Sequence, residues 1–330
     1  MQDVFSLPTM QVSAIPDHRY TEDISKAGDP PTMRNATDDM YVFSKAQGQW
    51  EQLKHGHKGM PTPRARLSSQ LVCVGDHLYL IAGWDPAAFG SGGDVLSDMW
   101  RYNLRTNTWS QLDPQGGQCL GAISRFQAVA VGALVYIHSH RSLCDIHVLD
   151  TGMEPPVLHK LAVTGDGAAS PGPPSRGLHS VVAMGGRLLL FGGAPKEGPM
   201  MDDLWSLDLA SLRWARLSPT GARPAARCSH FAGSIDGRYM WVVGGAHYAS
   251  PGKLANVDDV AVYDSEADAW VEVDVAGPRP SARNAGVAVS PLRTGGADGG
   301  GQQALLHAGW KAFAETYNDT FLLTLQASRA

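Results

Sequence analysis

The sequence has few cysteines, no long apolar run and no strong excess of either charge, and each absence excludes a class of protein. The four cysteines, Cys73, Cys119, Cys144 and Cys228, form no C-x-x-C pair and no zinc-like spacing, which favours a reduced intracellular chain. No stretch approaches the roughly 20 apolar residues that span a bilayer. The N-terminus carries Asp3 and lacks a basic segment followed by an apolar one, so no secretory signal is predicted. We therefore expect a cytoplasmic protein, with the nucleus as an alternative.

Charge and motif content exclude further functions. The net charge of −5 and the pI near 6.2 predict that neither nucleic acid nor an anionic membrane is the main partner. The sequence has no G-x-x-x-x-G-K-[ST], no G-x-S-x-G and no H-E-x-x-H motif. Arginine outnumbers lysine by 19 to 8, which suggests guanidinium groups at fixed positions rather than solvating charge.

Glycine and proline are abundant, and the chain repeats itself. In four segments a Trp lies eleven positions after an Asp, and an apolar residue follows three positions later. Weaker copies begin at Asp145 and Asp319. The four clear segments are Asp39 to Trp50, Asp98 to Trp109, Asp203 to Trp214 and Asp259 to Trp270. Six copies in all predict six repeating units.

Two further elements precede the aspartate in most units. One is an alternating apolar segment that ends in a pair of small residues, as in Leu188 to Gly193. Glycines after a buried strand allow positive φ and a close approach of neighbouring backbone. Before that segment lies another apolar one, opened by an arginine. These arginines are Arg66, Arg125, Arg176, Arg227 and Arg283. The unit is therefore a four-stranded antiparallel meander of about 50 residues, which buries both faces only by stacking on neighbours.

Paired glycines, an aromatic third strand and a spaced Trp resemble the kelch repeat of β-propellers over residues 38–325. The resemblance implies an all-β kelch-type β-propeller of six blades, each a four-stranded antiparallel meander. We expect residues 1–37 to be an irregular segment of which part closes the ring, and residues 38–330 to be a single propeller domain. Part of Met1 to Ile15 is expected to pair with the last blade or to complete the first.

Two blades depart from the pattern. The unit around residues 125–161 has His138 and Ser139 in place of the glycine pair, and Leu158 in place of the Trp, so we expect it to be shortened or distorted. The last unit stops near Leu325, before any Trp strand.

The expected binding surface is the rim where the arginines and the loops after the second strands meet. Loops on a rigid scaffold commonly carry binding residues, and aromatic and arginine side chains anchor interfaces. The predicted binding residues are Arg66, Arg125, Arg176, Arg227, Arg283, Trp84, His247, Tyr248, Trp310 and Phe313. Kelch adaptors, which this chain resembles, use this rim to grip acidic peptides. The repeat arginines have an alternative role, in which they bind blade carbonyls or pair with the repeat aspartates.

An enzyme is the rival hypothesis. His138 and His140 are two apart in a predicted strand, where both would point to one face and could form a metal pair. Loop histidines near the surface of an irregular blade are the simpler explanation, and the one we favour. Plant specifier proteins, which resemble this chain in fold, hold iron with a Glu-x-x-x-Asp-x-x-x-His pattern. Glu315 and Asp319 match its first two positions, and Leu323 replaces the histidine. The copper ligands of galactose-oxidase-like enzymes have no counterpart that we can locate.

The sequence thus predicts a monomeric protein-interaction module, without cofactor, catalytic residue or metal ligand. Its expected partner is a protein or peptide segment that is acidic or of mixed charge. The alternative is a small-molecule or metal-dependent kelch enzyme related to the plant specifier proteins.

Overall fold

The computed structural model describes residues 9–15, 36–53, 60–86, 93–115, 120–142, 145–165, 172–250, 253–292, 303–311 and 315–326. These residues form strands, turns and bends, as the all-β prediction requires. Within these ranges no helix has the length and apolarity needed to cross a membrane.

The chain divides into two compact units, one of residues 21–177 with 211–214 and the other of residues 1–20, 178–210 and 215–330. The first unit contains two four-stranded antiparallel sheets, which we call blades A and B. Blade A consists of β4 (Gln70–Val74), β5 (His77–Asp85), β6 (Asp94–Asn103) and β7 (Thr108–Leu112). Blade B consists of β8 (Gln127–Val131), β9 (Leu134–His138), β10 (Ile146–Asp150) and β11 (Val157–Leu161).

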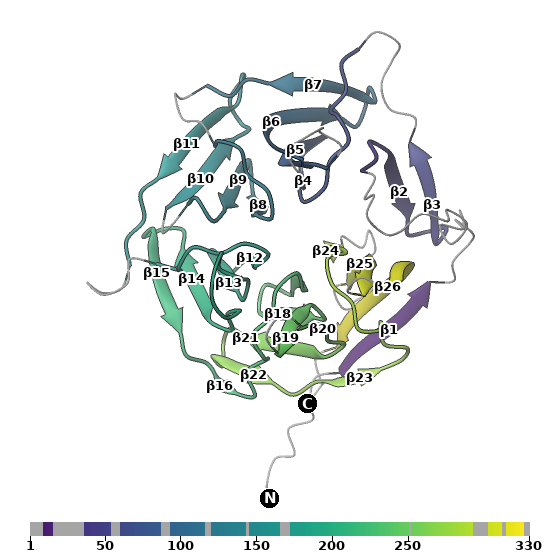
Figure 1. The fold of residues 1–330 in the computed structure, drawn as a ribbon, viewed down its shortest axis with the longest axis vertical. Coiled ribbons are helices and arrows are strands. Elements are labelled where there is room, and N and C mark those ends of the chain that lie inside the picture. The colour runs from purple at the N-terminus through teal and green to yellow at the C-terminus, as the bar shows by residue number, and fades with distance from the viewer. Residues whose placement is uncertain are drawn as a thin grey trace, which may run out of the picture. The chain divides into compact units, whose positions relative to one another are not determined.

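The second unit contains blades C, D and E (Figure 1). Blade C consists of β12 (Ser180–Met184), β13 (Arg187–Phe191), β14 (Leu204–Asp208) and β15 (Arg213–Leu217). Blade D consists of β17 (Phe231–Ile235), β18 (Tyr239–Val243), β21 (Val260–Asp264) and β22 (Ala269–Val271), with β16 (Thr220–Gly221) on its outer edge. Between β18 and β21 lies a separate hairpin of β19 (Ala246–Ser250) and β20 (Lys253–Asn256).

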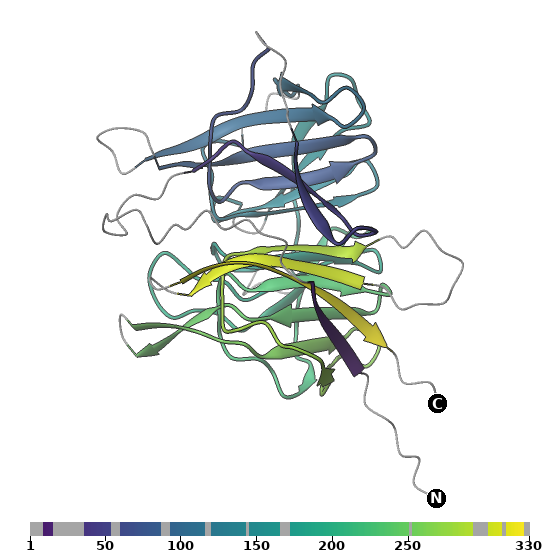
Figure 2. The same ribbon diagram turned by 90° about the vertical axis from the view of Figure 1, so that its right-hand side faces the viewer.

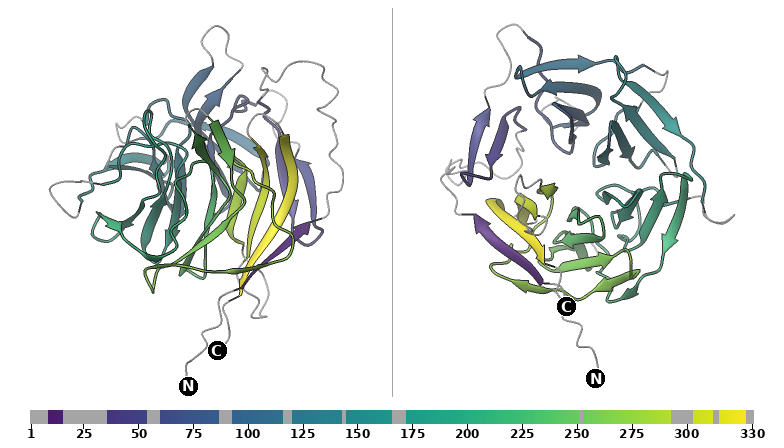
Figure 3. Two further views of the ribbon diagram at one scale, coloured as in Figure 1. Left: turned by 60° about the horizontal axis from the view of Figure 1, so that its bottom comes forward. Right: turned by 180° about the vertical axis from the view of Figure 1, so that it is seen from behind.

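Blade E takes its outer strand from the N-terminus of the chain. Its first three strands are β24 (Val287–Leu292), β25 (Gln303–Lys311) and β26 (Glu315–Gln326). β1 (Thr9–Ile15) pairs antiparallel with β26 over seven residues, and Figures 2 and 3 show the two strands side by side. β23 (Asp274–Ala276) then pairs parallel with β1. Of the two pairings expected for Met1 to Ile15, the structure has the one with the last blade.

The prediction of six blades is wrong, because among the residues that the structure describes five sheets have four or more strands. Among the described residues the first repeat contributes β2 (Met40–Ser44) and β3 (Gln49–Leu53), which form a two-stranded sheet. The reason lies in the preceding sequence. Upstream of Asp39 there is no apolar segment ending in paired glycines, so this repeat lacks the pattern that forms a second strand elsewhere.

Large rings fill the space between strands and between blades, as the repeat predicts. In blade A the Tyr102 and Trp109 rings lie 5.0 Å apart, and in blade D Tyr263 and Trp270 lie 5.7 Å apart. Trp270 also contacts Phe191 of blade C, with ring centroids 5.3 Å apart. One buried cluster therefore contains residues of both blades C and D. Aromatic side chains provide the largest buried apolar areas, so these contacts join neighbouring blades into a common core.

The glycine pair after the second strand allows close packing of backbone. Gly245 has φ +104°, and a Cβ there would lie 2.9 Å from both the Cys228 carbonyl oxygen and the His230 Cβ. Its N–H donates to the Arg283 carbonyl oxygen of blade E at 2.8 Å. A side chain would be strained by its φ and would clash, which explains the small residues at this point of the repeat.

Each outer strand is joined to the next by a short parallel pairing. The residues that follow the fourth strand of one blade pair with the outer strand of the following blade. These pairs are Gln115 with Val157, Thr164 with Arg213, Thr220 with Ala269, and Asp274 with Thr9. Arg213 and Trp214 of β15 belong to the first unit, so each of these pairs lies within one unit. β1 therefore occupies the position of a fourth strand in blade E.

Candidate functional site: projecting hairpins above arginine-clamped blades

The repeat arginine is a buried clamp inside its own blade. Arg66 is 9% exposed, and its guanidinium binds both carboxylate oxygens of Asp98, at 2.7 Å from Nη1 to Oδ1 and 2.8 Å from Nη2 to Oδ2. Nη1 also donates to the Ala82 carbonyl oxygen at 3.0 Å, and Nε to that of Arg64 at 3.1 Å. The arginine therefore joins the segment before β4 to β5 and to β6.

The same geometry recurs in blades D and E. Arg227 binds Asp259 at 2.5 and 2.6 Å and the Gly244 carbonyl oxygen at 3.0 Å. Arg283 binds both oxygens of Asp319 and the Ala308 carbonyl oxygen. The guanidinium fork matches a carboxylate bidentately, which a lysine cannot do.

In blade C, Arg176 is fully buried and donates Nε to the Pro174 carbonyl oxygen at 3.0 Å, as the other clamps do at their second residue upstream. Asp203 is buried and accepts from Trp205 Nε1 at 2.7 Å, in the same way that Asp98 accepts from Trp100 Nε1 at 2.6 Å.

Electrostatics agree with a structural clamp. Burial alone raises the pKa of Asp98, but the hydrogen bonds from Arg66 and Trp100 and the Arg66 charge outweigh it, so this pKa is lowered. The alternative role predicted for the repeat arginines is pairing with the repeat aspartates. Arg66, Arg227 and Arg283 adopt this geometry. Their guanidinium groups are engaged within the blades, which removes the basis for expecting an acidic partner there.

The alignment of Arg125 with the other four arginines is wrong. Arg125 is exposed and has φ +58°, and its N–H donates to the Ser68 carbonyl oxygen. Ser68, Leu178, Ser229 and Ala285 share this positive φ, and each lies two residues after its repeat arginine. Arg125 therefore corresponds to these residues, and the clamp position of blade B is Ile123, which is fully buried. The aspartate of this blade, Asp145, pairs with Lys160 instead.

The histidines of blade B lie in different environments. His138 ends β9, is fully buried and packs edge-on against Trp214 at 6.1 Å, whereas His140 lies beyond the strand and is exposed. The expectation that both share one strand face is therefore wrong. Within the described residues no three His, Cys, Asp or Glu side chains are placed to hold a metal ion. In the Glu315, Asp319 and Leu323 pattern, both Asp319 oxygens bind Arg283 and Leu323 is fully buried.

The loops after the glycine pairs form hairpins that extend the blades, which sequence reasoning did not predict. In blade A, Trp84 pairs with Val95 and Asp85 with Asp94. In blade D the extension is the β19–β20 hairpin, and in blade E it consists of residues 309–311 paired with 315–317. Trp84 is half-buried, and its indole packs so closely on Gly93 that a Cβ there would overlap it.

The hairpins of blades D and E are linked to each other. Asn256 Nδ2 donates to the Trp310 carbonyl oxygen at 2.8 Å. Tyr248 at the outer part of the β19–β20 hairpin is 54% exposed, while His247 beside it and Trp310 are half-buried. Tyr317 covers Arg283, with the guanidinium carbon 4.1 Å from the ring centroid. Of the predicted aromatic residues, Tyr248 is the most available, and Phe313 lies outside the described residues.

We use the name hairpin surface for residues 246–250, 253–256, 309–311 and 315–317. Its charges have both signs, because Lys253, Lys311 and Glu315 are all exposed, with Lys311 opposite Glu315 in the strand register. Asn256, which ties the two hairpins, was missed from the sequence because no repeat pattern includes it. The aromatic residues were predicted because they lie in the loops that follow the glycine pairs.

The sequence profile of the KLHDC2/KLHL20/DRC7 Kelch-repeats domain matches residues 145–329, and that of the Kelch motif matches residues 65–115. The chain is 27% identical to acyl-CoA-binding domain-containing protein 5 of Arabidopsis thaliana, over 70% of this chain and 35% of the relative. It is 27% identical to N-(sulfonatooxy)prop-2-enimidothioate sulfolyase of Thlaspi arvense, over 72% of this chain and 70% of the relative. It is 29% identical to serine/threonine-protein phosphatase BSL2 of Arabidopsis thaliana, over 66% of this chain and 22% of the relative.

The chain thus spans about a third of the length of the acyl-CoA-binding relative and less of the phosphatase. The solved structure titled "Structure of YjhT" superposes with a TM-score of 0.63 at 16% identity, over 84% of this chain and 87% of that one. At this identity the likeness concerns the fold alone.

Proposed function

Because the chain belongs to the KLHDC2/KLHL20/DRC7 kelch-repeat family and has the β-propeller fold, we propose that it is a protein-interaction module that binds its partner through the hairpin surface. The observation that carries this proposal is the pair of hairpins in blades D and E, joined by Asn256 and presenting Tyr248 to solvent. A tyrosine on a rigid scaffold offers apolar area and a polar group at low entropic cost, as in interface anchors.

The clamps explain why this surface can be rigid. Arg227 holds the Gly244 carbonyl oxygen immediately before the β19–β20 hairpin, and Arg283 holds that of Ala308 before the next one. Arg227 and Arg283, two of the arginines predicted to bind the partner, thus support the two hairpins. The charges of the hairpin surface are mixed, so we leave the partner's charge unspecified.

The proposal is tested by affinity capture from a native lysate with quantitative mass spectrometry. The variant is Tyr248→Ala/Trp310→Ala, and the control is Met153→Ala, which removes a side chain with the same 54% exposure from the turn before β11. All three proteins must first show the same thermal unfolding. We expect specific proteins on the wild type and the control that are lost from the variant.

Two results would contradict the proposal. Capture that is unchanged by the hairpin substitutions would place the interaction elsewhere. A wild type that captures no specific protein would favour a small-molecule function, as the similarity to the sulfolyase allows.

A further inference from the structure

Blade D has an incomplete outer edge. In blade A the register of the third and fourth strands includes Met99 with Leu112, and in blade B it includes Ile146 with Leu161. The corresponding residue of blade D is Val260, one position after the repeat aspartate. There the register covers only residues 262–264 with 269–271.

The cause is that the fourth strand of blade D is shared between two sheets. β22 ends at Val271, and from Asp274 the chain forms β23 beside β1 in blade E. Residues 272 and 273 connect the two sheets. They diverge from β21 before reaching the position opposite Val260, so Val260 has no paired residue in β22.

The backbone of Val260 is aimed at the vacated rung. The Asp259 carbonyl oxygen accepts from the Gly244 N–H, so the backbone of Asp259 faces the β18 side. Backbone groups of successive strand residues alternate between the two neighbours of an antiparallel strand. The N–H and C=O of Val260 therefore point to the β22 side, where the strand has ended. An open strand edge is a template for pairing with another chain.

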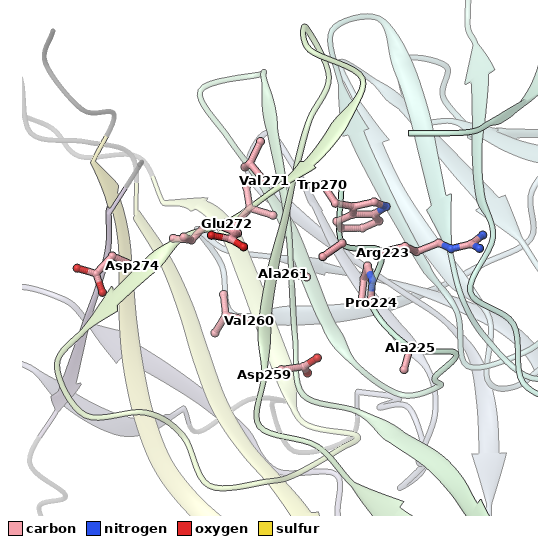
Figure 4. A pocket seen from close by; sticks show the side chains of 13 residues that line it. Arg223, Pro224, Ala225, Asp259, Val260, Ala261, Trp270, Val271, Glu272 and Asp274 are labelled. Carbon is pink, nitrogen blue, oxygen red and sulfur yellow. The ribbon is translucent and has the colours of Figure 1, made fainter. Parts of the chain in front are cut away.

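A groove of about 810 Å³ lies at this edge. It is lined on one side by Val260 and Ala261, on another by Val271 to Asp274, and by the linker of Ala222 to Ala225 (Figure 4). Trp270 and Pro224 add apolar walls. Figure 4 shows Glu272 pointing toward β21, and Arg223 pointing away from it.

The charge left in the groove is negative. Arg223 lies 3.5 Å from Asp202, and Arg227 is paired with Asp259, so neither guanidinium is placed to neutralise the exposed Glu272. Asp274 also lines the groove and is exposed. A partner with an extended backbone could take the vacated rung, and a positive side chain on it would be opposite Glu272.

We propose that this groove binds an extended segment of a partner protein that carries a lysine or arginine, with its backbone paired to Val260 and its cation facing Glu272. This is strand addition to a sheet edge, in which backbone hydrogen bonds supply affinity and flanking side chains supply specificity. The groove is formed by the outer edge of blade D and is separate in sequence from the hairpin surface, so each can be disrupted alone.

The probe is a fluorescein-labelled peptide, Val-Lys-Val-Lys-Val, measured by fluorescence anisotropy with the whole chain. It is compared with Val-Glu-Val-Glu-Val and with the lysine peptide N-methylated at its central residue, which cannot donate the strand hydrogen bond. The protein variants are Glu272→Lys and Glu272→Gln, and the control is Glu197→Lys, an exposed carboxylate outside the groove lining.

We expect the lysine peptide to bind, with at least tenfold weaker binding for the glutamate peptide, the methylated peptide and the Glu272→Lys protein. Glu272→Gln should be intermediate and Glu197→Lys unchanged. Absence of binding at about millimolar concentration, or equal binding of all three peptides, overturns the proposal. If sedimentation shows a dimer that Glu272→Lys dissociates, the groove is an interface between two copies of this chain, and the peptide proposal is again overturned.

Discussion

Removing the Asp259 carboxylate should destabilise the protein far more than removing the neighbouring one. Arg227 is 1% exposed at its side chain, whereas Asp259 is 48% exposed. Asp259→Ala therefore leaves a buried cation with only the carbonyl oxygens of Gly244 and Ala225 as partners. Breaking a buried ion pair in this way costs about 3–5 kcal/mol.

The half-exposure of Asp259 lowers that figure, since water can enter the space that the carboxylate leaves. We expect a loss of about 2–3 kcal/mol in the free energy of unfolding. Asp258→Ala is the matched control, because this carboxylate is exposed and next in sequence, and its removal should change stability by less than about 0.5 kcal/mol. Urea unfolding of both variants measures the difference.

A double-mutant cycle adds Arg227→Met and the double variant. The two side chains bind directly, so their changes should be non-additive by at least about 1 kcal/mol. If Asp259→Ala is as stable as Asp258→Ala, or if the two single effects simply add, the clamp does not stabilise the blade and the structural reasoning fails.

Three further changes test other parts of the fold. Burial, and secondarily the Arg227 charge, lower the pKa of His230 from 6.5 to about 3, so the unfolded state binds a proton that the folded state does not. Through this group the free energy of unfolding should fall by about 1.4 kcal/mol per pH unit between about pH 6.5 and about pH 3. Burial also lowers the pKa of His140 and of His147, so His230→Asn should keep a pH dependence in urea unfolding but with a shallower slope than the wild type; equal slopes would contradict the assignment. Deleting residues 1–15 removes the seven paired residues of β1 and should lower the free energy of unfolding by on the order of 5 kcal/mol. Deleting residues 1–8 leaves β1 in place and should change the melting temperature little. If the two deletion variants melt at the same temperature, β1 does not have this role. Gly245→Ala should destabilise the protein by about 2 kcal/mol more than Gly237→Ala. Both glycines have positive φ, but of the two only Gly245 has atoms close to the position of an added Cβ. Similar urea midpoints for the two variants would argue against tight packing at Gly245.

The regular parts of the fold could be predicted because the repeat is visible in the sequence. The Asp-to-Trp spacing identified the third and fourth strands, and the paired glycines identified the second. Arg125 shows where this reasoning fails. An arginine two positions from the clamp was mistaken for the clamp, because blade B has Ile123 there and a sequence alone does not show which residue has positive φ.

The candidate sites depended on side-chain direction, which spacing does not determine. Arg66, Arg227 and Arg283 point into the blades because they bind the repeat aspartates and the carbonyl oxygens after the second strands. The aromatic residues Tyr248 and Trp310, and not these arginines, therefore belong to the hairpin surface. The groove at Val260 depends on a strand that changes sheets between Val271 and Asp274. That change follows from the pairing of β23 with β1, about 260 residues away in sequence, and no local pattern predicts it.

Hydrogen–deuterium exchange on a captured protein partner tests the central claim most directly. On binding, the account predicts slower exchange of the β19–β20 hairpin and of residues 309–311 and 315–317, with unchanged exchange at the Gly185–Gly186 and Asp236–Gly237 turns, which join the first and second strands of blades C and D. Protection at those turns, with the hairpins unaffected, would contradict it.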